Sequence, residues 1–171
     1  MDIQTNIVNK VSSSGLISLD LAAFLPKEEQ IVYDIKKHLY QGIILREKDF
    51  REDLKNYDWS IFHDKYVALT CSIDAIIPNW AYMLLTLCMQ PYAKEVFLGD
   101  SESLQQHLLQ EAIKNIDLEK YRNQKVVVKG CGDTAISLGA YVAVTQKLGP
   151  VVASLMYGEP CSTVPLFKRK S

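Results

Sequence analysis

Short β-favouring runs alternate with helical segments from residue 65 onward, and this alternation restricts the possible folds more than any other feature. Four runs rich in β-branched, leucine and aromatic residues are expected as strands: 66–70, 95–98, 125–129 and 154–157. Three helical patterns separate them, one beginning near Pro78, one opening at Asp100 and one over 137–148. Strands that alternate with helices pair in parallel through helical crossovers. The sequence therefore predicts an α/β fold with a mostly parallel sheet.

An internal repeat lies within the same stretch. Shifting the chain by 60 residues places Cys71 on Cys131, and a one-residue gap later places Gly99 on Gly158. Ten positions are identical across the two copies. A duplicated β–α–β unit explains these matches, and coincidence between strands of similar chemistry is the alternative. We expect a single domain of 171 residues with this duplicated core at 63–171.

The segment 1–62 has a weaker pattern and is expected as a small N-terminal α+β flank. Alternating apolar and polar residues predict short strands at 17–21 and 31–35. The run LREKDFREDLKNY, which begins at residue 45, contains many helix formers and pairs Glu47 with Arg51 across one turn. We expect a surface helix there, and a helix that docks a partner is the alternative.

Three of the four cysteines follow predicted strands. Cys71 follows the run at 66–70, Cys131 follows the equivalent run of the second copy, and Cys161 comes shortly after the last strand. The carboxyl ends of parallel strands lie at one edge of a sheet, where α/β proteins bind ligands. The three thiols are therefore expected to converge in one pocket. Cys88 lies inside the apolar run WAYMLLTLCMQ and is expected in the core.

Converging thiolates repel one another unless they are protonated or bound to a cation. A soft metal removes the repulsion, and thiolate ligands favour zinc or an iron–sulfur cluster. The candidate metal ligands are Cys71, Cys131 and Cys161, with Asp74, Asp133 or Glu159, water or an exchangeable ligand in the fourth position. Two alternatives stay open: an enzyme with one reactive cysteine, such as a persulfide acceptor, and a non-catalytic interaction protein with structural cysteines.

Histidines and glycines give no stronger catalytic pattern. His63 precedes a strand and His107 lies within a helix, which leaves His38 as the histidine for a Cys–His pair. The segment GCGD at 130–133 lies at a strand-to-helix turn, where its amides can face an anion or its glycines can simply make the turn. Neither glycine-rich phosphate-loop motif occurs in the sequence.

Charge and hydropathy exclude several function classes. The formal net charge is −1, so the chain has no overall basic field for a nucleic-acid backbone. Its longest nearly apolar stretch, at 80–89, is far shorter than the roughly 20 residues of a membrane helix. The first residues lack a secretory signal pattern, and the four cysteines are therefore expected as thiols. We expect a soluble, cytoplasmic protein that binds neither nucleic acid nor membrane, and whether it forms homo-oligomers stays open.

Several phrases of the sequence resemble one protein family. They are LREKDFRE at 45–52, KYVALTCSIDAIIPNWAYMLL at 65–85, QPYAK at 90–94, VVVKGC at 126–131 and YGEPCSTVPLFKRK at 157–170. Over nearly its whole length the chain resembles DUF2480, a family of uncharacterised proteins from Bacteroidetes-type bacteria. Such proteins are encoded close to sulfur-mobilisation genes. The resemblance therefore implies iron–sulfur assembly proteins as partners and an accessory role in cluster assembly or sulfur handling.

Overall fold

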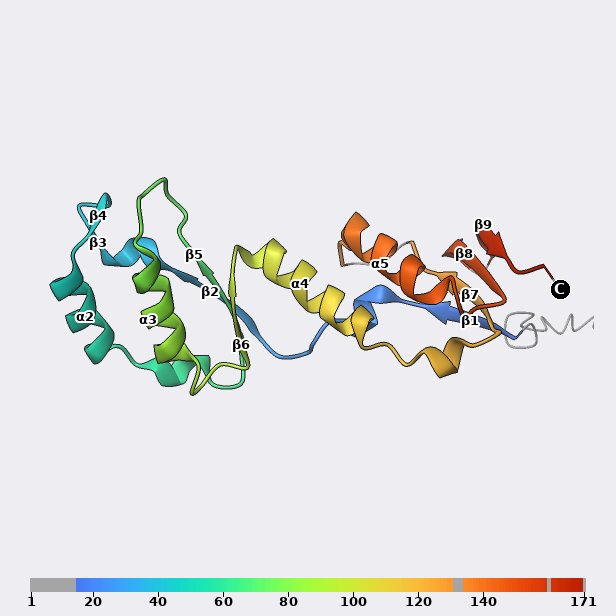
Figure 1. Ribbon diagram of the computed structural model, residues 1–171, viewed down its shortest axis with the longest axis horizontal. Coiled ribbons are helices and arrows are strands. Elements are labelled where there is room, and N and C mark those ends of the chain that lie inside the picture. The colour runs from blue at the N-terminus through green and yellow to red at the C-terminus, as the bar shows by residue number, and fades with distance from the viewer. Residues whose placement is uncertain (1–14, 131–133, 160, 171) are drawn as a thin grey trace, which may run out of the picture. The chain divides into compact units, whose positions relative to one another are not determined.

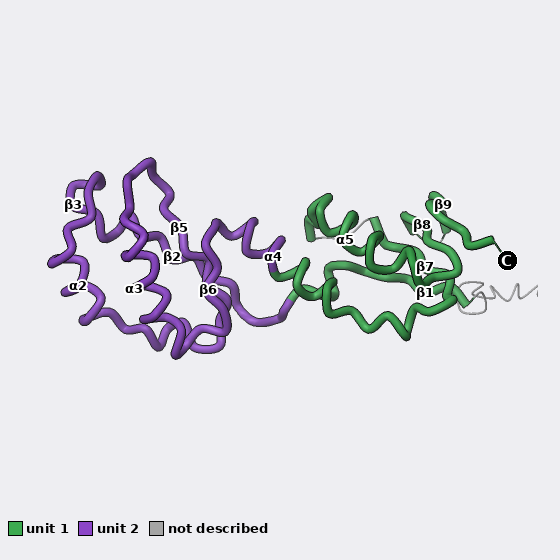
Figure 2. The backbone as a smooth tube through the Cα atoms, in the orientation of Figure 1, with its two compact units in different colours: residues 1–25, 108–171 green, residues 26–107 purple. Residues whose placement is uncertain are grey.

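The computed structural model describes residues 15–130, 134–159 and 161–170. The chain divides into two compact units, which Figure 2 distinguishes by colour. Unit 1 contains residues 1–25 and 108–171, and unit 2 contains residues 26–107. Each unit has its own main sheet and its own hydrophobic core.

Unit 2 is built on a three-stranded parallel sheet in the order β2–β5–β6. The strands are β2 (Gln30–Asp34), β5 (Tyr66–Thr70) and β6 (Glu95–Leu98). Helix α3 (Asn79–Met89) lies in the crossover from β5 to β6 (Figure 1). The central strand β5 has three consecutive buried residues, Val67, Ala68 and Leu69, because a parallel sheet is covered on both faces.

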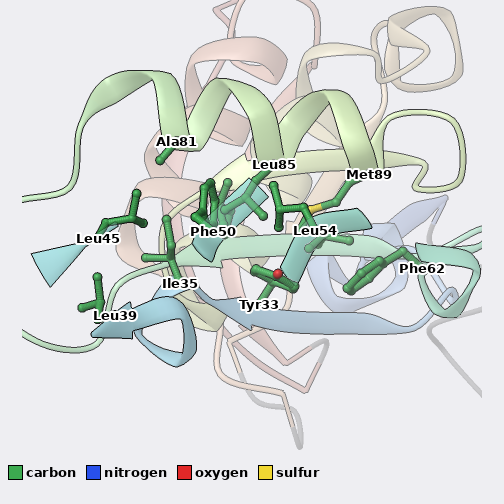
Figure 3. Close-up of a cluster of buried hydrophobic side chains, with 12 residues drawn as sticks. Tyr33, Ile35, Leu39, Leu45, Phe50, Leu54, Phe62, Ala81, Leu85 and Met89 are labelled. Carbon is green, nitrogen blue, oxygen red and sulfur yellow. The ribbon is translucent and has the colours of Figure 1, made fainter. Parts of the chain in front are cut away.

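The core of unit 2 joins this sheet to the remaining elements of the unit (Figure 3). These elements are the antiparallel pair β3 (Leu39–Tyr40) and β4 (Ile44–Leu45), the helix α2 (Glu47–Asn56) and the 3₁₀ helices η2 (Ile35–His38) and η3 (Trp59–Phe62). On α2, Phe50 and Leu54 are buried one turn apart while the charged residues stay exposed. This is the surface helix that the sequence predicts.

Unit 1 is built on a four-stranded sheet in the order β1–β7–β8–β9. The strands are β1 (Leu16–Leu19), β7 (Lys125–Val128), β8 (Ser154–Glu159) and β9 (Ser162–Lys168). β1, β7 and β8 are parallel, and β9 folds back antiparallel on β8. Helix α5 (Leu138–Leu148) lies in the crossover from β7 to β8, and its residues Ala140, Val144 and Leu148 are buried in the core of this unit.

Helix α4 (Ser101–Lys114) carries the chain from unit 2 back into unit 1, and the division between the units falls within it. The Asp100 side chain accepts a hydrogen bond from the Ser103 amide at 2.8 Å and so caps its first turn. The short helix η4 (Leu118–Tyr121) then leads to β7. No helix in the described parts of the chain is long and apolar enough to cross a membrane.

The predicted α/β class and the mostly parallel pairing are confirmed, but the strands do not form one sheet. β1 and β2 come from the segment 1–62, which was expected as a flank, and each pairs with an inner strand of a different sheet, β1 with β7 and β2 with β5. The expected bounds 1–62 and 63–171 therefore do not coincide with the two units. The reason is physical: strand partners are chosen by long-range packing, on which the local sequence pattern carries no information.

Candidate functional site

A cavity of about 300 Å³ opens at the carboxyl ends of the parallel strands in unit 1. Its lining includes residues at or just after the ends of β1, β7 and β8, together with the loop before α5 and a side chain of α5 itself. These residues include Asp20, Lys129, Gly130, Thr134, Tyr141 and Tyr157. Open α/β sheets bind ligands at this edge. The cavity is therefore the first candidate site of the molecule.

One wall of the cavity carries an ion pair. The Asp20 carboxylate accepts a hydrogen bond from the Ala22 amide at 3.0 Å, and its other oxygen lies 3.7 Å from Lys129 Nζ. Both side chains are partly exposed, so the pair contributes little to stability. It does hold one positive and one negative group at the cavity, where a polar ligand can contact either.

A pair of tyrosines forms another part of the lining. The Tyr141 hydroxyl donates to the Lys129 carbonyl at 3.4 Å, and the Tyr141 and Tyr157 rings meet edge to face at 5.7 Å between centroids. Gly130 allows this packing, because a Cβ atom there would lie 2.4 Å from the Tyr157 hydroxyl oxygen. Neither tyrosine was predicted from the sequence as a site residue, although Tyr141 matches Tyr82 in the internal repeat.

Of the cysteines predicted at this edge, Cys161 is described and exposed. It lies in the turn between β8 and β9, where Glu159 pairs with Ser162. Cys131 and Asp133 lie outside the described residues, but their neighbours in the sequence, Gly130 and Thr134, both line the cavity. Cys161 and Cys131 thus follow two adjacent parallel strands of the same sheet.

Cys71 belongs to the other unit. It follows β5 directly, and its Sγ donates to the Ile73 carbonyl at 3.3 Å. Asp74 lines a separate, largely apolar cavity of about 750 Å³ beside the β3–β4 pair. The prediction of one shared pocket assumed one sheet, whereas the strands before Cys71 and Cys161 lie in different sheets. Within the described ranges, no three His, Cys, Asp or Glu side chains are grouped so that they could hold a metal ion.

Cys88 lies on α3, where the sequence places it, and packs half-buried against the core of unit 2. Burial raises the pKa of its thiol, so the neutral form is favoured. This environment is typical of a structural cysteine rather than a nucleophile or a ligand.

The histidines are engaged with residues other than cysteine. His38 bonds to Tyr33 and Asp53, with its Nε2 2.7 Å from the Tyr33 hydroxyl. His107 stacks on the Phe97 ring, and its Nε2 forms a hydrogen bond with the Glu95 carboxylate. His63 is exposed. The structure therefore gives no described Cys–His pair.

At the carboxyl edge of unit 2, Asp34 holds the position that Asp20 holds in unit 1. Partial burial opposes ionisation of Asp34, but hydrogen bonds from Ser72 and from Lys36 outweigh it and lower the pKa to about 2. The carboxylate accepts from the Lys36 amide at 3.0 Å and from the Ser72 amide at 3.2 Å. The Asp34 carboxylate therefore links η2, through Lys36, to the loop that begins at Cys71, through Ser72.

Comparison with known families places the chain in one of them. Residues 5–169 match the family described as "Protein of unknown function (DUF2480)". Since the match covers nearly the whole sequence, the chain belongs to this family. No curated protein and no solved structure matches the chain.

Proposed function

We propose that this member of the DUF2480 family binds a soft metal, as a zinc ion or an iron–sulfur cluster, through Cys131 and Cys161 of unit 1. One observation carries the proposal: in the sequence, the two cysteines follow β7 and β8, which are adjacent parallel strands. Val128 at the end of β7 is paired with Tyr157 of β8. In the sequence, Cys131 and Cys161 come three and four residues after these paired positions.

The chemistry of the available donors fits such a metal. Two thiolates at one edge repel each other, and a soft cation stabilises both at neutral pH. Glu159 ends β8 next to the Cys161 turn, and Asp133 follows Cys131 closely in the sequence, so a carboxylate is available to complete the set. Cys71 and Asp74 belong to the other unit and are not part of this narrower ligand set.

The neighbouring cavity suggests what the metal site does. A site with two thiolates and one carboxylate leaves a coordination position for an exchangeable ligand, as catalytic zinc sites do. The cavity, whose lining includes Gly130 and Thr134 on either side of Cys131 in the sequence, has room for a small molecule. We therefore propose an accessory role in iron–sulfur assembly or sulfur handling, in which the exchangeable ligand is a sulfur species or a partner's side chain.

The alternative of one nucleophilic cysteine has less support. A helix start lowers a thiol pKa only over the first turn. Helix α5 begins at Leu138, well after Cys131 in the chain. Cys161 lies in a turn between two strands rather than at a helix start.

Elemental analysis of protein purified without a tag and without oxygen tests the proposal. We expect about one metal centre per chain, lost when Cys131 or Cys161 is changed to serine. Cys88→Ser is the matched control, because Cys88 packs against the core, and it should retain the metal. Cys71→Ser should also retain the metal. Loss of the metal in this variant would instead indicate the ligand set of Cys71, Cys131 and Cys161. Metal retained in the Cys131→Ser/Cys161→Ser double variant would overturn the proposal.

We also propose that the two units are copies of one β–α–β unit, extended at the N-terminal side by one further strand each. Corresponding details support this. Asp20 directly follows the edge strand β1, Asp34 is the last residue of the edge strand β2, and each side chain caps the 3₁₀ helix that comes next. Thr86 and Thr145 each donate to a tyrosine carbonyl one turn earlier in the crossover helix. A structure-based search for the same element order in shorter relatives tests the duplication.

A further inference from the structure

Lys37, in unit 2, holds its amine against two tyrosine rings. It lies on η2, which follows β2 directly. Its Nζ is 3.6 Å from the centroid of the Tyr33 ring and 4.2 Å from that of Tyr57, and it bonds to the Tyr57 hydroxyl at 3.1 Å. The amine therefore has a fixed position, which a surface lysine rarely has.

A separate cavity of about 320 Å³ opens beside this amine. Much of its lining is apolar and comes from β2 and from η3, including Ile31, Val32, Ile61 and Phe62. Lys37 and Tyr57 line the same cavity and supply an amine and a hydroxyl, and the ion pair of Lys36 with Asp34 also lines it. A ligand with an apolar body and one polar, reactive end matches this lining.

Partial burial favours the neutral form of the Lys37 amine. Burial lowers the pKa of the Lys37 amine, and the charge of Asp34 only partly opposes this. The Asp34 carboxylate is itself paired with Lys36 Nζ at 3.3 Å. Among the described residues, no carboxylate forms an ion pair with Lys37. A lowered pKa increases the neutral fraction of a lysine amine, and that fraction is the nucleophile toward carbonyl carbon.

The neighbouring phenol can exchange protons with a bound molecule. Burial and the nearby charge of Asp58 raise the pKa of Tyr57, so its hydroxyl stays protonated at neutral pH. The hydroxyl oxygen accepts from Lys37, which leaves its own proton free to be donated to a second oxygen.

We propose that Lys37 forms a reversible imine with a small aldehyde whose apolar body occupies this cavity. The neutral amine attacks the carbonyl carbon, and the C=O π electrons move to the oxygen. The nitrogen then gives up its remaining protons, the former carbonyl oxygen leaves as water, and a C=N bond forms. Tyr57 donates one proton to the departing oxygen and regains one from the nitrogen, and the second proton of the water also comes from the nitrogen. No oxidant or reductant takes part, and hydrolysis reverses the reaction.

Reductive trapping tests this site in the full-length protein. Benzaldehyde and sodium cyanoborohydride are added at pH 7, and the hydride converts any imine into a stable secondary amine. Peptide mass spectrometry then compares Lys37 with Lys36, its neighbour on the same helix, which is paired with Asp34. We expect the label at Lys37 to exceed the label at Lys36 roughly tenfold at early times.

Variants of the cavity complete the experiment. Lys37→Arg should remove the rapid label while Lys36→Arg leaves it unchanged, and both keep the positive charge. Tyr57→Phe keeps the ring but should slow labelling of Lys37 several-fold. Glyoxylate, which lacks an apolar body, should label Lys37 no faster than Lys36. Equal labelling of the two lysines by benzaldehyde in the unaltered protein, which needs no variant, would overturn the proposal.

Discussion

The buried hydroxyl of Tyr33 lies 2.7 Å from Nε2 of His38, at the centre of the unit 2 core. Tyr33 is 2% exposed, and its only described hydrogen-bond partner is this ring nitrogen. The other nitrogen of His38 lies 2.9 Å from an Asp53 carboxylate oxygen, which faces solvent. A neutral imidazole that donates to Asp53 and accepts from Tyr33 satisfies all three groups.

The stability of the protein is expected to depend on pH through His38. Burial lowers its pKa, while the hydrogen bond and charge of Asp53 only partly oppose this, and the charge of Lys37 adds to the lowering. The unfolded state therefore binds the proton more readily than the folded state. The stabilising contribution is complete above the unfolded value of about 6.5 and is lost as the pH falls toward the folded pKa.

Urea unfolding between pH 8 and pH 5 measures this dependence. The free energy of unfolding should fall over that range, and His38→Gln should flatten the fall. His63→Gln is the control, because His63 is exposed and its loss should leave the profile unchanged. An unaltered profile in His38→Gln would assign the pH dependence to other groups.

Removing the Tyr33 hydroxyl should destabilise unit 2. Tyr33→Phe keeps the ring in the core but leaves the His38 acceptor unpaired in a buried position, at a cost of about 1–3 kcal/mol. Tyr92→Phe, at a partly exposed position, should change stability by less than about 0.5 kcal/mol. Chemical denaturation of both variants checks the difference, and equal effects would show that the Tyr33–His38 bond contributes nothing net.

Two glycines of unit 1 should respond to alanine with opposite signs. In Gly130→Ala, the new Cβ meets the Tyr157 hydroxyl at 2.4 Å, so the ring must move and stability should fall by about 1–2 kcal/mol. In Gly139→Ala, the Cβ has ordinary contacts and lies within α5, so helix propensity should raise stability by up to about 1 kcal/mol.

A double-mutant cycle identifies the clash in Gly130→Ala. Tyr157→Ala removes the ring, and Gly130→Ala should then cost much less than it does alone. If the cost is the same in both backgrounds, the glycine is required for another reason.

Asp34 should contribute to stability only where it is ionised. Its pKa of about 2 lies below the ordinary value of 3.8, so the contribution is present above 3.8 and is lost as the pH falls through about 2. Asp34→Ala should lower stability at pH 6 by about 1 kcal/mol, as the loss of a helix cap does, and should reduce the steepness of acid unfolding. The exposed carboxylate Asp49 serves as the matched control, and an equal effect of Asp49→Ala would contradict the assignment.

Local sequence signals predicted the elements but not their assembly. The bounds of β5 and the cap at Asp100 follow from residues close together in the chain, and both were predicted. The partners of β1 and β2 depend on contacts across long stretches of sequence, so the division into two sheets was not predicted. The three-cysteine pocket rested on the expectation of a single sheet, and it stays a prediction because Cys131 lies outside the described residues. The Gly130–Tyr157 contact was missed because the need for a glycine there is set by a ring from another strand.

The discontinuity of unit 1 has a consequence for how the chain folds during synthesis. β1 leaves the ribosome early, but its partner β7 begins only at Lys125, after all of unit 2 has been made. At the usual speed of translation, β7 is synthesised roughly 5 to 20 s after β1. Unit 2 is continuous in sequence and has its full set of strands before then. We therefore expect unit 2 to fold first, and β7 of unit 1 to pair later with an edge strand that was synthesised before it.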